Sequence, residues 1–190
     1  YLSAVETAKL IRQALKQAFP GIKFSVRSET YSGGASVDVR WTDGPRLVEV
    51  EPVAHQYEGG RFDGMIALVY SVKHYLAPDG RVLLAHNPGS SGSGGMDSGQ
   101  DNLPLARIMP PGVQLVTFGA KHVSCQRTVS DYDRKHSEAI AWLYAHCVLI
   151  GDSGNPNLDR FGNYAVSDYA HRMTRDWGDG EDLADNFHRR

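Results

Sequence analysis

Histidine and cysteine, two of the residue types that bind metals, recur in the second half of the chain. His122 and Cys125 lie three residues apart, and His136, His146 and Cys147 follow. A structural zinc site needs four such ligands that converge tetrahedrally, usually from closely spaced pairs. On a strand, residues three apart point to opposite faces of the sheet. The spacing therefore predicts no metal site, and no cofactor is expected.

Nucleophilic and acid–base chemistry has equally little support. A cysteine nucleophile needs a lowered thiol pKa and a partner base, and the sequence shows neither for Cys125 or Cys147. Asp63 precedes Gly64, and this pair is typical of tight turns. We predict no catalytic residue. An undescribed enzyme is the third-ranked hypothesis, and it would require a pocket that joins His122, Asp63 or Cys125.

A glycine- and serine-rich stretch, NPGSSGSGGMDSGQDN, occupies residues 87–102. A phosphate-binding loop would need a lysine within a strand–loop–helix frame, which is missing here. The composition instead predicts a flexible loop, with ordering on partner binding as the alternative.

Charged residues indicate one surface that could bind a partner near the N-terminus. The alternation of apolar and polar residues in two short segments predicts a hairpin with one polar face. This face would display Lys23, Arg27, Asp38 and Arg40. Such a face either is solvated, with ion pairs across the strands, or docks an anionic partner.

A second candidate surface is acidic and lies at the C-terminal end. Residues 151–190 contain eight Asp or Glu against five Arg, whereas residues 1–149 contain fourteen against fifteen Lys or Arg. The candidate contacts are Asp179, Glu181, Asp182 and Asp185. They form either a solvated tail or an arm that docks on a basic protein surface.

The overall composition bounds the class of protein. With 190 residues, 41% of them hydrophobic, the chain can bury a core as one domain with an appendage. A net charge of −2 gives no global reason for tight binding to nucleic acid. Two cysteines provide no disulfide framework, and no apolar run approaches the roughly 20 residues of a membrane helix. We therefore expect a soluble, cytoplasmic protein without membrane contact.

The first elements that must position these residues are a helix and a hairpin. Ser3 and Glu6 form a capping box, and apolar residues then recur every three or four positions up to Pro20. Alternating strands follow around residues 23–27 and 36–41. A second helix over residues 45–57, capped by Thr42 or Asp43, comes next.

More strands and two further helices are predicted downstream. Strands at 66–76 and 81–86 flank a turn, and another run covers 113–117 and 122–128. Ser130 and Asp133 form a second capping box, which predicts a helix over 131–148, and a short helix is expected within 167–177. The fold class is α+β: a mainly antiparallel sheet of about five strands, with two or three helices, spans residues 1–150. The first helix and the helix at 131–148 are expected to pack on this sheet, and residues 151–190 form a short, helical, acidic appendage.

Several unusual sequence motifs occur in order along the chain: LIRQALKQAFPGIKFSVRS, YSGG, VDVRWTDGP and RFDGM, with a looser match, VTFGAKHVSCQRTVS, near the third predicted helix. In these motifs the chain resembles the large polyvalent protein-associated domain family over residues 5–150. The resemblance implies a small domain of plasmids, integrative elements or phages. Such domains are fused to, or encoded beside, proteins thought to help incoming DNA survive in a new host.

Two functional hypotheses follow from that resemblance and from the charges. The first is an accessory protein that counteracts a host defence system, of the restriction or CRISPR type, by binding a protein of that system. The alternative is an accessory domain that binds nucleic acid through Lys23, Arg27 and Arg40, with Tyr31 or Trp41 stacking on bases.

Overall fold

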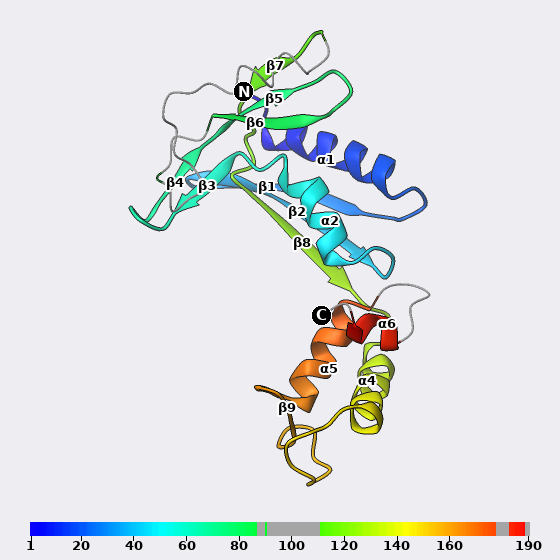
Figure 1. Ribbon diagram of the computed structural model, residues 1–190. Coiled ribbons are helices and arrows are strands. Elements are labelled where there is room, and N and C mark those ends of the chain that lie inside the picture. Colours follow the sequence, from blue (N-terminus) through cyan, green and yellow to red (C-terminus); the bar gives the residue numbers. More distant parts are fainter. Residues whose placement is uncertain (87–89, 91–110, 178–182, 189–190) are drawn as a thin grey trace. The chain divides into compact units, whose positions relative to one another are not determined.

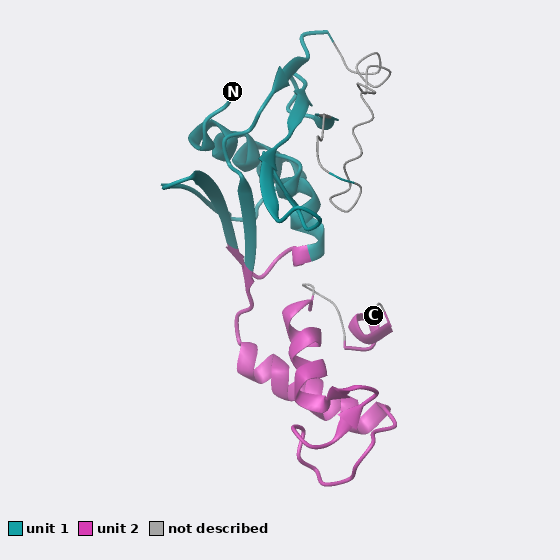
Figure 2. Ribbon diagram, turned by 90° about the vertical axis from the view of Figure 1, so that its left-hand side faces the viewer, with its two compact units in different colours: residues 1–40, 48–126 teal, residues 41–47, 127–190 magenta. Residues whose placement is uncertain are grey.

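The computed structural model describes residues 1–86, 90, 111–177 and 183–188, and the chain divides into two compact units (Figure 1). Unit 1 comprises residues 1–40 and 48–126, and unit 2 comprises residues 41–47 and 127–190 (Figure 2). The predicted loop at 87–102 lies outside the described residues, apart from Ser90.

Unit 1 begins with helix α1 (Ala4–Ala18), which starts at the predicted capping box. The Glu6 amide donates to the Ser3 hydroxyl at 3.3 Å, and the Ser3 amide donates to the Glu6 carboxylate at 2.7 Å. The apolar stripe of α1 is buried, with Ile11 and Leu15 fully inaccessible. α1 contacts strand β1 (Ser25–Tyr31), and Arg12 donates to the carbonyl of Val26 at 2.8 Å. The helix is thus fixed on the sheet by burial and by a hydrogen bond.

The predicted hairpin is formed by β1 and β2 (Gly34–Thr42), which pair antiparallel. Gly33, in the turn, has a φ of +98°, which glycine adopts without strain. Strand β8 (His122–Thr128) pairs on the far side of β2, so the order is β1-β2-β8. Val26, Val37 and Val39 lie on the buried face of the hairpin. The period-two pattern thus predicted the correct face.

Helix α2 (Leu47–His55) confirms the second predicted helix, with Pro52 inside it. The prediction that Asp43 caps this helix is wrong. Asp43 has a φ of 55°, and its carboxylate accepts the Ser130 amide at 2.9 Å and the Ser130 hydroxyl at 2.5 Å. The side chain therefore holds the residue that follows β8.

The remaining strands of unit 1 form two small antiparallel sheets. β3 (Gly60–Asp63) pairs with β4 (Leu68–Ser71), and β5 (Lys73–Leu76) pairs with both β6 (Val82–His86) and β7 (Gln114–Val116). The α+β class is confirmed, but the strands are shared among several small sheets instead of one sheet of about five. The predicted strand 66–76 is divided at Val72, which is fully buried and donates its amide to the Gly59 carbonyl at 2.9 Å.

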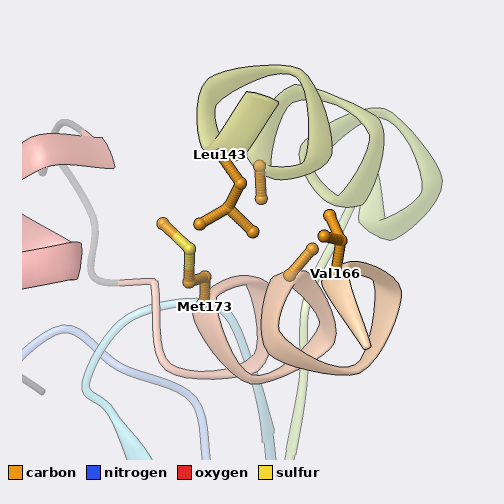
Figure 3. Packing of buried hydrophobic residues seen from close by; sticks show 5 residues of the cluster. Leu143, Val166 and Met173 are labelled. Atoms are coloured by element: carbon orange, nitrogen blue, oxygen red, sulfur yellow. The ribbon is translucent and has the colours of Figure 1, made fainter. Parts of the chain in front are cut away.

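Unit 2 contains helices α4 (Tyr132–His146), α5 (Val166–Arg175) and α6 (Leu183–His188), and the short strands β9 (Arg160–Phe161) and β10 (Tyr164–Ala165). A buried cluster of five residues joins α4 to α5 (Figure 3): Ala139, Leu143, Val166, Ala170 and Met173. The sequence analysis placed helix 131–148 on the sheet, whereas its buried residues belong to this core. Unit 2 therefore includes residues 127–150, which belong to the segment 1–150 that the sequence analysis assigned to one domain.

The predicted capping box at Ser130 is not formed. Asp131 is the N-cap of α4, with a φ of 52° and no side-chain cap hydrogen bond. The Ser130 hydroxyl is instead bound to Asp43. Among the described residues, no helix combines the length and the apolar character that a membrane crossing requires.

Candidate functional site

A groove of about 670 Å³ opens on unit 1 between the β1–β2 turn, the end of α2, the β3–β4 hairpin and the start of β8. Its volume falls within the range of roughly 300–1,000 Å³ that is usual for ligand sites. The groove is lined by Tyr31, Gly33, His55, Glu58, Gly60, Arg61, Phe62, Val69, Lys121 and His122. It therefore contains cations, aromatic rings and a carboxylate together.

Glu58 is the polar centre of the groove. Its carboxylate accepts from the Val123 amide at 2.9 Å and lies 2.9 Å from Nδ1 of His122. Arg61 approaches the second carboxylate oxygen to 3.7 Å. The Glu58 side chain is only 14% exposed, whereas that of His122 is 68% exposed. Because a carboxylate accepts from a protonated Nδ1, the Nε2 of a neutral His122 is left as an acceptor.

Two glycines make this arrangement sterically possible. The Gly59 amide donates to the carbonyl of Ala120 at 2.8 Å, and its carbonyl accepts from Val72 at 2.9 Å. A Cβ on Gly59 would lie 1.9 Å from the carbonyl oxygen of Phe118, and one on Gly60 would lie 2.4 Å from that of Lys121. The chain therefore crosses residues 118–121 at a distance that admits no side chain.

Lys121 and Tyr31 flank a third glycine on the opposite wall. A Cβ on Gly34 would meet the Lys121 stem at 3.2 Å and the Tyr31 ring at 3.3 Å. The Lys121 ammonium donates to the carbonyl of Gly33 at 2.9 Å. Within the described residues this ammonium pairs with no carboxylate, so its charge is uncompensated.

The β3–β4 hairpin adds exposed apolar side chains beside the groove. Phe62 and Val69 are paired across the two strands and are 64% and 52% exposed. Met65 and Ile66, in the turn, and Leu68, at the start of β4, are 73%, 56% and 60% exposed. We call these five residues the hairpin patch. Exposed apolar side chains gathered on one short hairpin mark binding sites more often than isolated exposed residues do.

Comparison with known families decides which family the chain represents. The profile of the family described as large polyvalent protein associated domain 29 matches residues 2–130. The chain belongs to this family. The resemblance found in the sequence motifs is thereby confirmed. No curated protein and no solved structure matches the chain.

The large polyvalent protein associated domain extends from α1 to the residues just after β8, and it includes every residue that lines the groove. Helices α4, α5 and α6 follow the matched segment. Domains of this family are associated with proteins of mobile genetic elements and phages. The groove is thus a property of the family domain, whereas the α4–α5 core lies outside the match.

The structure places the predicted residues of the sheet face as the alternation indicated. Arg27 pairs with Asp38 and Arg40 with Ser25 across β1 and β2, opposite the face that packs on α1. Lys23 is exposed just before β1. Asp38 also accepts a hydrogen bond from the Ser124 hydroxyl of β8. The residues therefore do share a surface, and their role in binding stays a prediction.

The acidic candidates at the C-terminal end are only partly visible. Asp179, Glu181 and Asp182 lie outside the described residues. Asp185 lies on α6 and is exposed. Their docking role is likewise still a prediction.

The residues considered for catalysis are not brought together. The Asp63 carboxylate accepts from Ser90 and from the Met65 amide, so it forms a turn as predicted. Burial raises the pKa of the Cys125 thiol to about 12, and the charges of Glu51 and Glu58 add to the effect, so the thiolate form is disfavoured. Of the three candidates, only His122 lines the groove.

Sequence reasoning missed Glu58, Arg61 and Lys121 as members of one site. Lys121 is 60 residues from Arg61 and 63 from Glu58 in the sequence, and only the Gly59–Gly60 pair signalled a close approach. Glycine is also common at the ends of helices, so the pair alone does not distinguish a close approach from a helix end. The glycine pair between Glu58 and Arg61 was the sequence feature that could have indicated this site.

Proposed function

We propose that the protein is an accessory factor of a mobile genetic element or phage that counteracts a host defence system of the restriction or CRISPR type. It acts by binding a protein of that system. The observation that carries this proposal is the hairpin patch: Phe62, Met65, Ile66, Leu68 and Val69, each at least half exposed on one short hairpin. The association of the family with mobile elements and phages supports the context.

Hydrogen bonds to Asp63 fix the conformation of the hairpin that carries the patch. The Asp63 carboxylate accepts the Ser90 hydroxyl and amide, each at 2.7 Å, and the Met65 amide at 2.9 Å. These hydrogen bonds, that of the Ser90 hydroxyl first, hold the pKa of Asp63 below its ordinary value. The turn is thereby held in one conformation, which lowers the entropy cost of binding.

Charges next to the patch specify the chemistry of the partner. Arg61 lies on β3 and Lys121 lines the same groove, and in the part of the chain that the structure describes the Lys121 ammonium pairs with no carboxylate. A matching surface presents apolar side chains bordered by carboxylates, because opposite potentials favour encounter and register.

Replacing Met65 and Leu68 by Glu should abolish the protective effect. The two carboxylates would have to be desolvated in an apolar interface, and we expect at least a tenfold loss of protection. The measurement is plating efficiency of phage, or transfer efficiency of a plasmid, on hosts that carry one restriction or CRISPR system each. Val48→Glu is the matched control, since Val48 on α2 is 59% exposed and lies outside the patch.

Two results would contradict the proposal. If the wild-type protein protects against no restriction or CRISPR system, the defence role is wrong. If the double variant folds and protects as well as the wild type, the hairpin patch is not the binding surface. Titration of the purified defence complex with both proteins separates the second result from poor expression.

The sheet face supports the alternative, nucleic-acid binding, less well than its cations suggested. Arg27 faces Asp38 across the strands, and Glu29 lies on the same face. The net positive charge of this surface is therefore small, and binding to phosphates depends on such charge.

A further inference from the structure

The groove combines groups that recognise two different parts of a nucleotide. Lys121 and Arg61 supply cations for a phosphate, and Tyr31 and Phe62, which are 49% and 64% exposed, supply rings on which bases can stack. The only carboxylate that lines the groove within the described residues is that of Glu58. It already faces His122, Arg61 and the Val123 amide.

Tyr31 and Lys121 are held as a pair. Both lie against Gly34, where an added Cβ would contact the Lys121 stem at 3.2 Å and the Tyr31 ring and hydroxyl at 3.3 Å. The lysine is also anchored to the Gly33 carbonyl at 2.9 Å, which leaves two of its three donor hydrogens for a ligand. An aromatic ring and a cation are thus pre-positioned side by side at one wall.

The lining of the groove contains a second cation and a second aromatic ring. Arg61 and Phe62 are consecutive residues of β3, and both line the groove. A strand of bases and phosphates needs such alternating ring and cation contacts, whereas a duplex hides its base faces by stacking. The volume of about 670 Å³ is open to solvent and matches a short segment better than a double helix.

We propose that this groove binds single-stranded nucleic acid, with bases stacked on Tyr31 and Phe62 and phosphates bound by Lys121 and Arg61. The cations of this site differ from those of the basic sheet face, although Tyr31 is a stacking candidate in both, and the inference goes beyond the proposed protein-binding function. DNA and RNA share the chemistry used here, so the experiment includes both.

The test is fluorescence anisotropy with labelled twelve-nucleotide poly-dT and poly-rU, and with a twelve-base-pair duplex, at 50 mM salt. We expect at least one single strand to bind in preference to the duplex. The logarithm of affinity should fall with the logarithm of salt with a slope of about −1.4, which corresponds to about two phosphate contacts. Binding of poly-dT but not poly-rU, or the reverse, identifies the natural strand.

The variants separate the groove from other cationic surfaces. Lys121→Met keeps the aliphatic stem over Gly34 and removes the charge, so the salt slope should shrink by about 0.7. Tyr31→Leu should weaken binding about tenfold through lost stacking. Lys16→Met, at an exposed position of α1 to which no binding role is assigned, removes an equal charge and should leave affinity within about twofold.

The proposal is overturned if neither single strand binds, if the duplex binds as tightly, or if Lys16→Met weakens binding as much as Lys121→Met. Circular dichroism checks that each variant is folded, and Lys121→Met and Tyr31→Leu report on the site independently. Neither residue belongs to the turn of the hairpin patch tested for protein binding. Phe62 belongs to both surfaces, but the protection assay changes Met65 and Leu68 and the nucleic-acid assay changes Tyr31 and Lys121, so each proposal fails on its own variants.

Discussion

Gly59→Ala is expected to unfold the region around the groove, with a loss of at least ~3 kcal/mol in the free energy of unfolding. The new Cβ would lie 1.9 Å from the Phe118 carbonyl oxygen, a backbone atom that cannot rotate away. Relief requires separating the two segments. That movement breaks the hydrogen bonds from Gly59 to Ala120 and from Val72 to Gly59, at 2.8 and 2.9 Å.

Gly64→Ala is the matched control for this prediction. A Cβ at Gly64 would meet nothing closer than the Phe62 ring at 3.9 Å, and the residue is exposed. Its substitution should change stability by less than about 1 kcal/mol. Urea titration monitored by hydrogen exchange of peptides from β3, β5 and β8 makes the comparison within unit 1. Equal stability of the two variants would show that the segments are not in close contact.

The sequence predicted those features of the fold that depend on residues close together along the chain. The capping box at Ser3 and Glu6 and the hairpin of β1 and β2 are set by residues near in sequence, and both were predicted correctly. The box at Ser130 failed because Asp43, eighty-seven residues away, accepts the Ser130 hydroxyl and amide. A local motif predicts well only where no distant group binds the same donor.

The same limit explains the groove and the second core. The apolar stripe of α4 showed that the helix is buried on one side, but not which partner buries it, and α5 supplies Val166, Ala170 and Met173. Likewise, nothing in the sequence around Glu58 indicates that its carboxylate contacts the His122 ring and accepts a hydrogen bond from the Val123 amide. Periodicity identifies a buried face, whereas the partner of that face depends on chain topology.

The second large expected effect is a loss of stability in acid, caused by the buried side chain of His74. The side chain is 2% exposed on β5, its ring lies 5.0 Å from that of Phe118, and Nδ1 has no hydrogen-bond partner in the part of the chain that the structure describes. Burial, assisted by the charge of Arg61, lowers the pKa of His74 from its usual 6.5 to about 4. The folded protein therefore holds this ring neutral at a pH where the unfolded chain protonates it.

The sign of the effect follows from that difference. Because the folded pKa is depressed, the contribution is fully present above pH 6.5 and is lost as the pH falls toward 4. The loss amounts to about 1.4 kcal/mol per pH unit, or about 3 kcal/mol across this range. His74→Leu removes the titrating group and the unpaired nitrogen while keeping an apolar side chain of similar size. The difference in free energy of unfolding between variant and wild type should therefore grow by about 3 kcal/mol from pH 7 to pH 4.

Taking this difference cancels the titration of the carboxylates that the two proteins share, Asp43, Asp63 and Asp159 among them, whose pKa values are lowered in the folded chain. Urea titrations of both proteins at pH 7, 6, 5 and 4, followed by hydrogen exchange of β5 and β7, provide the measurement. If the difference in free energy of unfolding stays constant with pH, His74 is protonated in the folded protein at the same pH as in the unfolded chain. In that case its Nδ1 must have a partner, and the packing of His74 on Phe118 would not be the source of acid sensitivity.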